Sequence, residues 1–351
     1  MLRFSQSFFT KLSALKSVSN CPPGLNDTTI NNWCEGSMNV LAHLNSYLQL
    51  RPIPSYGPYE IHPYILKEKL QFDLSRKYLL LGTFPPNSYL HNTPGLGPLA
   101  MTHPQINKVP KVDFYYGNTA NLWKYFFGNN ILPNRPDIIQ FLQTNSIAIS
   151  DVILGVQRRK FGSYEDKDLY NILPNYELCS ILDSNIETIL FTSGSLKSIK
   201  LNQNDQISLS PLNTLTIFLS ILKTCQANLL IEVSGDTTGK GVFYPLTKEG
   251  LALSLQQQSG HIIWWLKIGD KKFRIINLPT PATALGVMRS NFFRRWIVWK
   301  AKQNGLSPAH FTNWKKYMMN HPNIFKTPYT NQYRTEVYNL AIQNIKGLQQ
   351  I

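Results

Sequence analysis

Short apolar runs, each closed by small or polar residues, recur through the middle of the chain. They occupy residues 78–81, 146–149, 188–191 and 273–278. Runs of this length that are bounded by turn residues are typical of strands buried on both faces of a parallel sheet. We therefore expect four such strands.

Apolar residues repeat at helical spacing in the segments between these runs. The clearest groups lie at residues 122–127, 138–142 and 178–182. Strands that alternate with helices predict an α/β fold with a mostly parallel sheet. In open sheets of this kind, ligands bind outside the carboxyl ends of the strands. Residues 82–87, 150–159, 192–195 and 279–284 are therefore expected to converge on one site.

The charge balance points to a polyanionic partner. The chain has 351 residues, with 35 Lys and Arg against 20 Asp and Glu, which gives a formal charge of +15. Only 16% of residues are charged, so the excess comes from a shortage of acids. Nucleic acid is the first candidate partner. The alternative is a protein that is basic for solubility.

Several classes of protein are disfavoured by composition. The best apolar run, residues 215–222, is too short and too polar for a membrane span, so we expect no membrane partner. The four cysteines lack the close pairs typical of zinc or iron–sulfur sites. We therefore expect four reduced thiols, no metal and no cofactor.

Three parts of the chain are expected. Residues 1–74 read as an N-terminal helical extension with a Pro-rich connector, and residues 1–19 suit either an amphipathic helix or an organelle transit peptide. Residues 75–300 form the α/β domain, with insertions near 93–113 and 201–260. Residues 301–351 form a C-terminal helical extension. Its aromatics and cations, Tyr333 and Arg334 among them, either pack as a helix pair or extend a DNA-binding face.

Three segments carry candidate chemistry: 81–86 (LGTFPP), 115–123 (YYGNTANLW) and 278–284 (LPTPATA). Aromatics beside carboxamides can stack on a planar ring and read its polar edge. The alternative for the second segment is that Tyr115, Tyr116 and Trp123 are core residues and Asn118 caps a helix. The third segment is a stiff loop followed by cations, which suits a phosphate backbone. Its alternative is a solvated basic helix face.

In this order the three segments resemble the active-site motifs of the uracil-DNA glycosylase superfamily. The closest branch is that of the hypoxanthine-DNA glycosylases and mismatch-specific uracil glycosylases. The resemblance covers roughly residues 75–300. It implies a three-layer αβα sandwich around a short, mostly parallel central sheet. It also implies a monofunctional DNA glycosylase that needs no metal. We further expect a monomer that is associated with the nucleoid in the cytoplasm, with organelle targeting by the N-terminus as the alternative.

The resemblance also implies roles for individual residues. Asn121 would position water or bind the base, with Asp151 as a reserve water activator; Asp151 can equally be a structural carboxylate. The residues expected to contact the flipped base are Gly82, Thr83, Phe84, Tyr116, Asn118 and Ser193. Those expected to contact DNA are Pro279, Thr280, Thr283, Arg289, Arg294 and Arg295.

Three positions depart from the family pattern. Thr83 and Phe84 stand where many relatives carry a water-activating carboxylate or Asn, and Ser193 stands where relatives often have Asn. A non-catalytic DNA-binding or damage-recognition protein on the same fold is therefore the alternative function. If the enzyme is active, its substrate is either a deaminated base or a modified base of foreign DNA.

Overall fold

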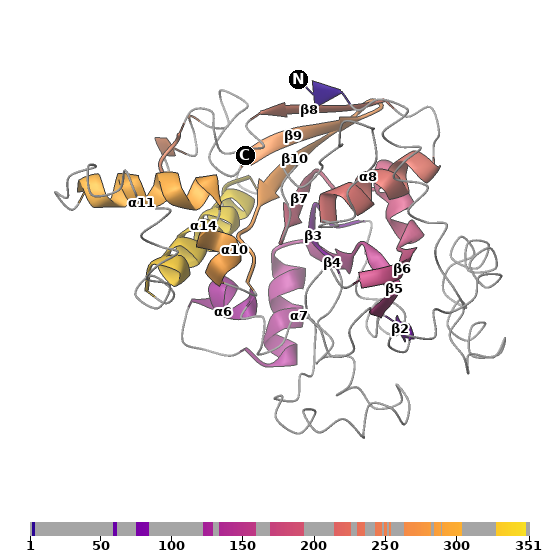
Figure 1. Cartoon of the computed structure of the whole chain (residues 1–351), viewed down its shortest axis with the longest axis horizontal. Helices are drawn as coiled ribbons and strands as arrows, with labels where there is room; N and C mark the ends of the chain where they lie inside the picture. The colour runs from indigo at the N-terminus through magenta and orange to yellow at the C-terminus, as the bar shows by residue number, and fades with distance from the viewer. Residues whose placement is uncertain are drawn as a thin grey trace.

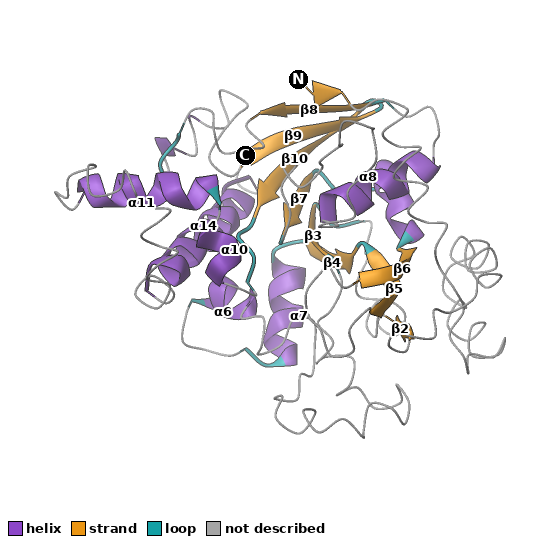
Figure 2. Cartoon of the chain, in the orientation of Figure 1, coloured by secondary structure: helices purple, strands orange, loops and turns teal. Residues whose placement is uncertain are grey.

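The computed structural model describes a mixed α/β fold with a mostly parallel central sheet (Figures 1 and 2). The described residues are 2–3, 59–61, 75–83, 122–128, 133–158, 169–192, 214–225, 230–235, 243–247, 249–250, 253, 263–281, 284–288, 290–303 and 328–348.

Four neighbouring parallel strands form the centre of the sheet, in the order β4-β3-β7-β10. They are β3 (Tyr78–Gly82), β4 (Ile147–Asp151), β7 (Thr188–Phe191) and β10 (Lys271–Asn277), which confirms the four strands expected from the apolar runs. The chain adds β4 on one side of β3 and then β7 on the other. The carboxyl ends of β3 and β7 therefore flank the point at which the strand order reverses.

Three antiparallel strands extend this sheet beyond β10. They are β9 (Ile263–Ile268), β8 (Ile231–Gly235) and β1 (Leu2–Arg3). A turn at Gly269, where φ is +58°, joins β9 to β10, and glycine adopts this left-handed backbone without a Cβ penalty. The sequence did not predict these strands; β8 lies in the segment read as an irregular insertion.

A second sheet has three antiparallel strands in the order β2-β5-β6. They are β2 (Tyr59–Ile61), β5 (Ile153–Arg158) and β6 (Leu169–Pro174). Because β5 begins two residues after β4 ends, this sheet starts at the carboxyl end of a central strand.

Two hydrophobic clusters lie on the two faces of the central sheet. Along β3, Tyr78 and Leu80 belong to the first cluster, whereas Leu79 and Leu81 belong to the second. This alternation is the period-two geometry of a strand buried on both faces. The first cluster includes residues from α6 (Leu122–Phe127), α7 (Arg135–Thr144), α10 (Ala284–Met288), α11 (Asn291–Gln303) and α14 (Pro328–Leu348). The second includes residues from η5 (Tyr176–Asp183) and α8 (Thr214–Cys225).

The expected helical segments are present, with one difference in type. Segments 122–127 and 138–142 lie in α-helices, and Asn134 starts α7 with a capping box that it shares with Asp137. Residues 178–182 lie in η5, which is a 3₁₀ helix. Apolar spacing at three and four residues predicts a helical face but does not separate these two helix types.

Helix α14 packs into the first cluster through Tyr333, Val337 and Tyr338. The ring of Tyr338 meets that of Phe126 on α6 edge to face, with 4.7 Å between ring centroids. The C-terminal segment was expected either to pack or to extend a DNA-binding face. Residues 328–348 pack against the protein core.

Two further findings concern cysteine and membranes. Cys179 is disulfide-bonded, so the expectation of four reduced thiols is wrong at this residue. Cysteine spacing along the chain does not reveal such a pairing, because tertiary packing decides which sulfurs meet.

Within the described part of the chain, no helix is both long and apolar enough to cross a membrane.

Candidate functional site

The carboxyl ends of the four parallel strands lie side by side at one edge of the sheet. The backbone N–H of Thr192 donates to the Leu81 carbonyl at 3.1 Å, which links the ends of β7 and β3. The N–H of Leu278 donates to the Phe191 carbonyl at 2.7 Å, which links β10 to β7. We call residues 82–83, 151, 192 and 278–280 the strand-end site. These described strand ends are bonded neighbours at one edge of the sheet.

The first motif lies against the end of β4. Gly82 is paired with Asp151 in the sheet register. Beyond this pair, the N–H of Val152 donates to the Gly82 carbonyl at 3.0 Å, and the N–H of Ile153 donates to the Thr83 carbonyl at 3.2 Å. Both first-motif carbonyls are thus bonded to the chain that leaves β4.

The hydroxyl of Thr83 is used inside the protein. Its Oγ1 lies 2.7 Å from Oγ1 of Thr214, the first residue of α8, and both side chains are buried. The sequence assigned Thr83 to base contact through its backbone and gave Thr214 no role. The signal for Thr214 is its place directly before the apolar run of α8, where a helix N-terminus favours Thr.

Asp151 is fully buried at the end of β4. The side-chain amide of Asn175 donates to Oγ of Ser150 at 3.0 Å and to the backbone carbonyl of Asp151 at 2.9 Å. Asn175 also accepts from the N–H of Glu177 at the start of η5. A carboxylate without exposed surface can activate water only if that water is buried beside it. Sequence reasoning missed Asn175, although Asn directly before a helical segment is a capping signal.

The third motif, residues 278–284, follows β10, and we call it the late loop. Two side chains of α14 bond to its residues Pro279 and Thr280. The Tyr338 hydroxyl donates to the Pro279 carbonyl at 3.1 Å, and Nε of Arg334 donates to the Thr280 carbonyl at 2.9 Å. Burial raises the pKa of Tyr338 above its ordinary value, although the nearby Arg334 acts in the opposite direction. The hydroxyl therefore remains a donor at neutral pH.

The same arginine contacts α6, the helix that begins within the second motif. Nη1 of Arg334 donates to the Tyr125 hydroxyl at 3.2 Å and to Oδ1 of Asn331 at 3.3 Å. The Tyr125 hydroxyl donates to the same Oδ1 of Asn331 at 3.0 Å. Arg334 is only 4% exposed, so it joins α6 to the late loop from inside the protein. The sequence had left this residue as a possible part of a DNA-binding face.

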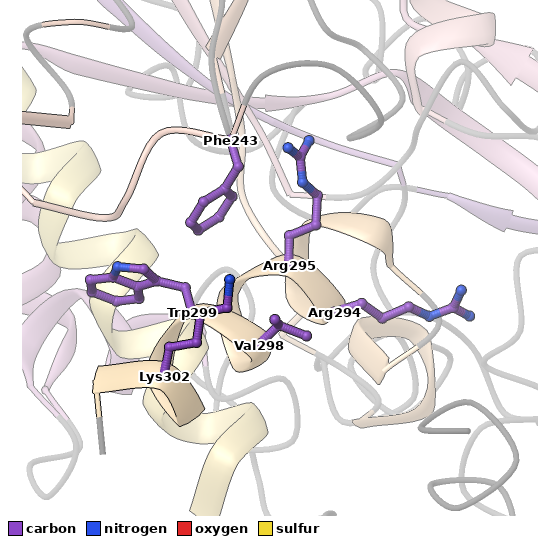
Figure 3. A pocket seen from close by; sticks show the side chains of 6 residues that line it. All are labelled: Phe243, Arg294, Arg295, Val298, Trp299 and Lys302. Atoms are coloured by element: carbon purple, nitrogen blue, oxygen red, sulfur yellow. The ribbon is translucent and has the colours of Figure 1, made fainter. Parts of the chain in front are cut away.

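Arg294 and Arg295 lie on α11, which extends to the left of the sheet in Figure 1. With four other residues they line a pocket of about 370 Å³ (Figure 3). We call it the α11 pocket; its lining is Phe243, Arg294, Arg295, Val298, Trp299 and Lys302.

The remaining predicted site residues lie outside the described part of the chain. They are Phe84, Tyr116, Asn118, Asn121, Ser193, Thr283 and Arg289. Trp123 is described and is 3% exposed in the first cluster, which confirms its reading as a core residue. Among the described residues, no group of three or more His, Cys, Asp or Glu is placed to hold a metal ion.

No protein-family model, curated protein or solved structure matches this chain.

Proposed function

We propose that the protein is a monofunctional DNA glycosylase built as a three-layer αβα sandwich. The observation that carries the proposal is the strand-end site. It places the first motif, the end of β7 and the late loop side by side at the edge where parallel sheets bind ligands. The formal charge of +15 supports a DNA partner.

A glycosylase must remove its target base from the stack to reach the glycosidic bond. Cleavage develops positive charge on the sugar and negative charge on the leaving base. Amide and backbone N–H donors can stabilise the leaving base. We assign base contact to the first motif and to Tyr116, Asn118 and Ser193. DNA contact falls to the late loop and the cations after it.

Asn121 is the leading candidate to position water or bind the base. It directly precedes α6 in the sequence, and α6 is linked to the late loop through Tyr125 and Arg334. This connection supports a common site for the second and third motifs. The enzyme would work as a monomer, associated with the nucleoid in the cytoplasm, either in repair or in defence against foreign DNA.

The test is an abasic-site assay with purified protein. Oligonucleotides carrying uracil, hypoxanthine, 5-hydroxymethyluracil or glucosylated hydroxymethylcytosine are incubated and then treated with alkali. We expect strand cleavage at one class of base. Asn121→Ala should lower turnover by about 100-fold or more and leave DNA affinity unchanged, because a transition-state contact is lost. Asn339→Ala, an exposed position on α14, is the matched control and should retain parent activity.

A non-catalytic DNA-binding protein is the second candidate. It is favoured by the first motif, which has no carboxylate and whose Thr83 hydroxyl is bonded to Thr214. Full burial of Asp151 favours it as well. Tight, salt-dependent binding to DNA without cleavage of any base in the panel would support this function over the glycosylase.

A further inference from the structure

The α11 pocket combines two aromatic side chains with three cations. Five of the lining residues come from α11 and follow one another at helical spacing, so they share one side of the helix. They are Arg294, Arg295, Val298, Trp299 and Lys302. Phe243 comes from a separate segment and closes the pocket opposite them (Figure 3).

The charged side chains that line the pocket are all cations. Helix α11 contains two Arg and two Lys and no acidic residue. Lys300 of this helix, which does not line the pocket, forms an ion pair with Glu336 of α14 at 2.7 Å. Nε of Arg294 is buried and has no hydrogen-bond partner within the described part of the chain. The three lining cations therefore favour an anionic ligand.

The aromatic walls give this anion site a second property. The rings of Phe243 and Trp299 are 6.4 Å apart between centroids and inclined at 51°, and both side chains are partly exposed. The guanidinium of Arg295 lies 5.3 Å from the Phe243 ring centroid. Aromatic faces beside cations are the arrangement on which proteins stack unpaired bases while they hold the adjoining phosphates.

We propose that the α11 pocket binds an unpaired nucleotide of a DNA strand. The base stacks on Trp299 or Phe243, and Arg294 and Lys302 pair with the flanking phosphates. Bases within a duplex are already stacked on both faces, so the aromatic walls select for single-stranded DNA. The proposal rests on the DNA-binding part of the proposed function and adds a strand preference at a position separate from the strand-end site.

The test compares binding of three 12-nucleotide probes by fluorescence anisotropy: single-stranded oligothymidylate, a duplex, and a strand of base-free residues. Trp299→Ala should weaken binding to oligothymidylate about tenfold, because one stacking contact is lost. It should leave binding to the base-free strand unchanged. Trp299→Phe retains a stacking surface and should restore most of the affinity.

Lys302→Glu tests the phosphate contact. It should weaken binding to both single-stranded probes and lower the slope of log affinity against log salt. Lys267→Glu is the matched control. Lys267 is exposed on β9 and is paired with Lys272 at the amino end of β10, whereas α11 follows the carboxyl end. This control should change single-strand affinity by less than Lys302→Glu does.

Equal affinity of the parent and Trp299→Ala for oligothymidylate would overturn the proposal, provided that both proteins unfold at similar temperatures. Equal losses on all three probes would also overturn it, because they would show a charge or folding effect without base stacking. Displacement of the oligonucleotide by an equal concentration of thymidine monophosphate would assign the pocket to free nucleotides instead. Failure of this inference can be distinguished from failure of the proposed function. Base excision by the parent, with equal oligothymidylate affinity of the parent and Trp299→Ala, defeats this inference alone. Weaker oligothymidylate binding by Trp299→Ala, with no base excision by the parent, defeats the glycosylase alone.

Discussion

Arginines in two regions of the molecule have opposite surroundings. Arg334 of α14 is 4% exposed and donates hydrogen bonds to the Thr280 carbonyl, the Tyr125 hydroxyl and Asn331. Arg294 and Arg295 of α11 are partly exposed and line a pocket together with Lys302. Both sets follow the late loop in the sequence. Arg334 holds that loop from inside the protein, whereas Arg294 and Arg295 present positive charge at a pocket.

This difference changes the meaning of the net charge. A count of Lys and Arg treats every cation as available to a polyanion. A cation that satisfies internal carbonyls contributes to packing and to the position of a loop, and its burial limits direct contact with DNA. The cations of α11 are the stronger candidates for the electrostatic part of DNA binding.

The largest effect on stability is expected when the buried arginine is replaced. Arg334→Met keeps much of the side-chain volume but removes three hydrogen bonds. The partners are then left without this donor in a buried setting, so we expect the free energy of unfolding to fall by about 2–4 kcal/mol. Chemical denaturation monitored by fluorescence measures the change. Arg334→Lys should not restore it, because a single ammonium cannot reproduce the planar fork.

Arg295→Met is the matched control from the other region. It removes a cation near an aromatic ring at a partly exposed position, so its effect on stability should stay below about 1 kcal/mol. Equal destabilisation by the two substitutions would show that the structural division between the two regions is wrong.

Alkaline pH provides the next largest effect, because the α14 region contains buried phenols. Burial raises the pKa of both Tyr333 and Tyr338 above the ordinary value of 10.0. Their contribution to stability is complete below pH 10 and is lost as the pH rises further, because the unfolded chain ionises first. For each of the two tyrosines, the free energy of unfolding should fall by about 1.4 kcal/mol per pH unit above pH 10.

Unfolding free energies measured between pH 9 and 11 check this expectation. Tyr338→Phe removes one of the two phenols, so its stability should fall less steeply with pH than that of the parent, by about 1.4 kcal/mol per pH unit. An unchanged slope would mean that Tyr338 is not buried as a neutral phenol.

The central strands were predictable because each is a short apolar run with both faces buried. Residues 78–81 show this most clearly, since all four side chains are buried in alternate clusters. The antiparallel extension was not predicted. Its strand β9 pairs with β10 in a hairpin across the turn at Gly269, which was not recognised from the sequence. The other partner of β9 is β8, which is more distant in the sequence, and such pairing leaves little local signal.

The candidate site was predictable in outline only. Strand ends at Gly82, Asp151 and Pro279 follow from the rule that parallel strands share a carboxyl edge. The supports at Thr214, Asn175 and Arg334 could not be derived from the motifs. Their long-range contacts join residues 24 to 209 positions apart, which only the tertiary fold brings together.

The smallest expected effect tests whether the two regions are coupled. Glu336 of α14 accepts from Nε1 of Trp296 at 2.7 Å and pairs with Lys300 at 2.7 Å, so it joins α14 directly to α11. Glu336→Gln keeps one oxygen that can accept from Trp296. It removes the charge and the second oxygen, which pairs with Lys300 and accepts from Gln332. Because the ion pair is partly exposed, we expect a loss of about 0.5 kcal/mol that shrinks as salt is added. Denaturation at low and high salt measures it, and oligothymidylate affinity should change by less than twofold. A larger change in affinity would show that α14 controls the α11 pocket, and the two regions would then act as one site.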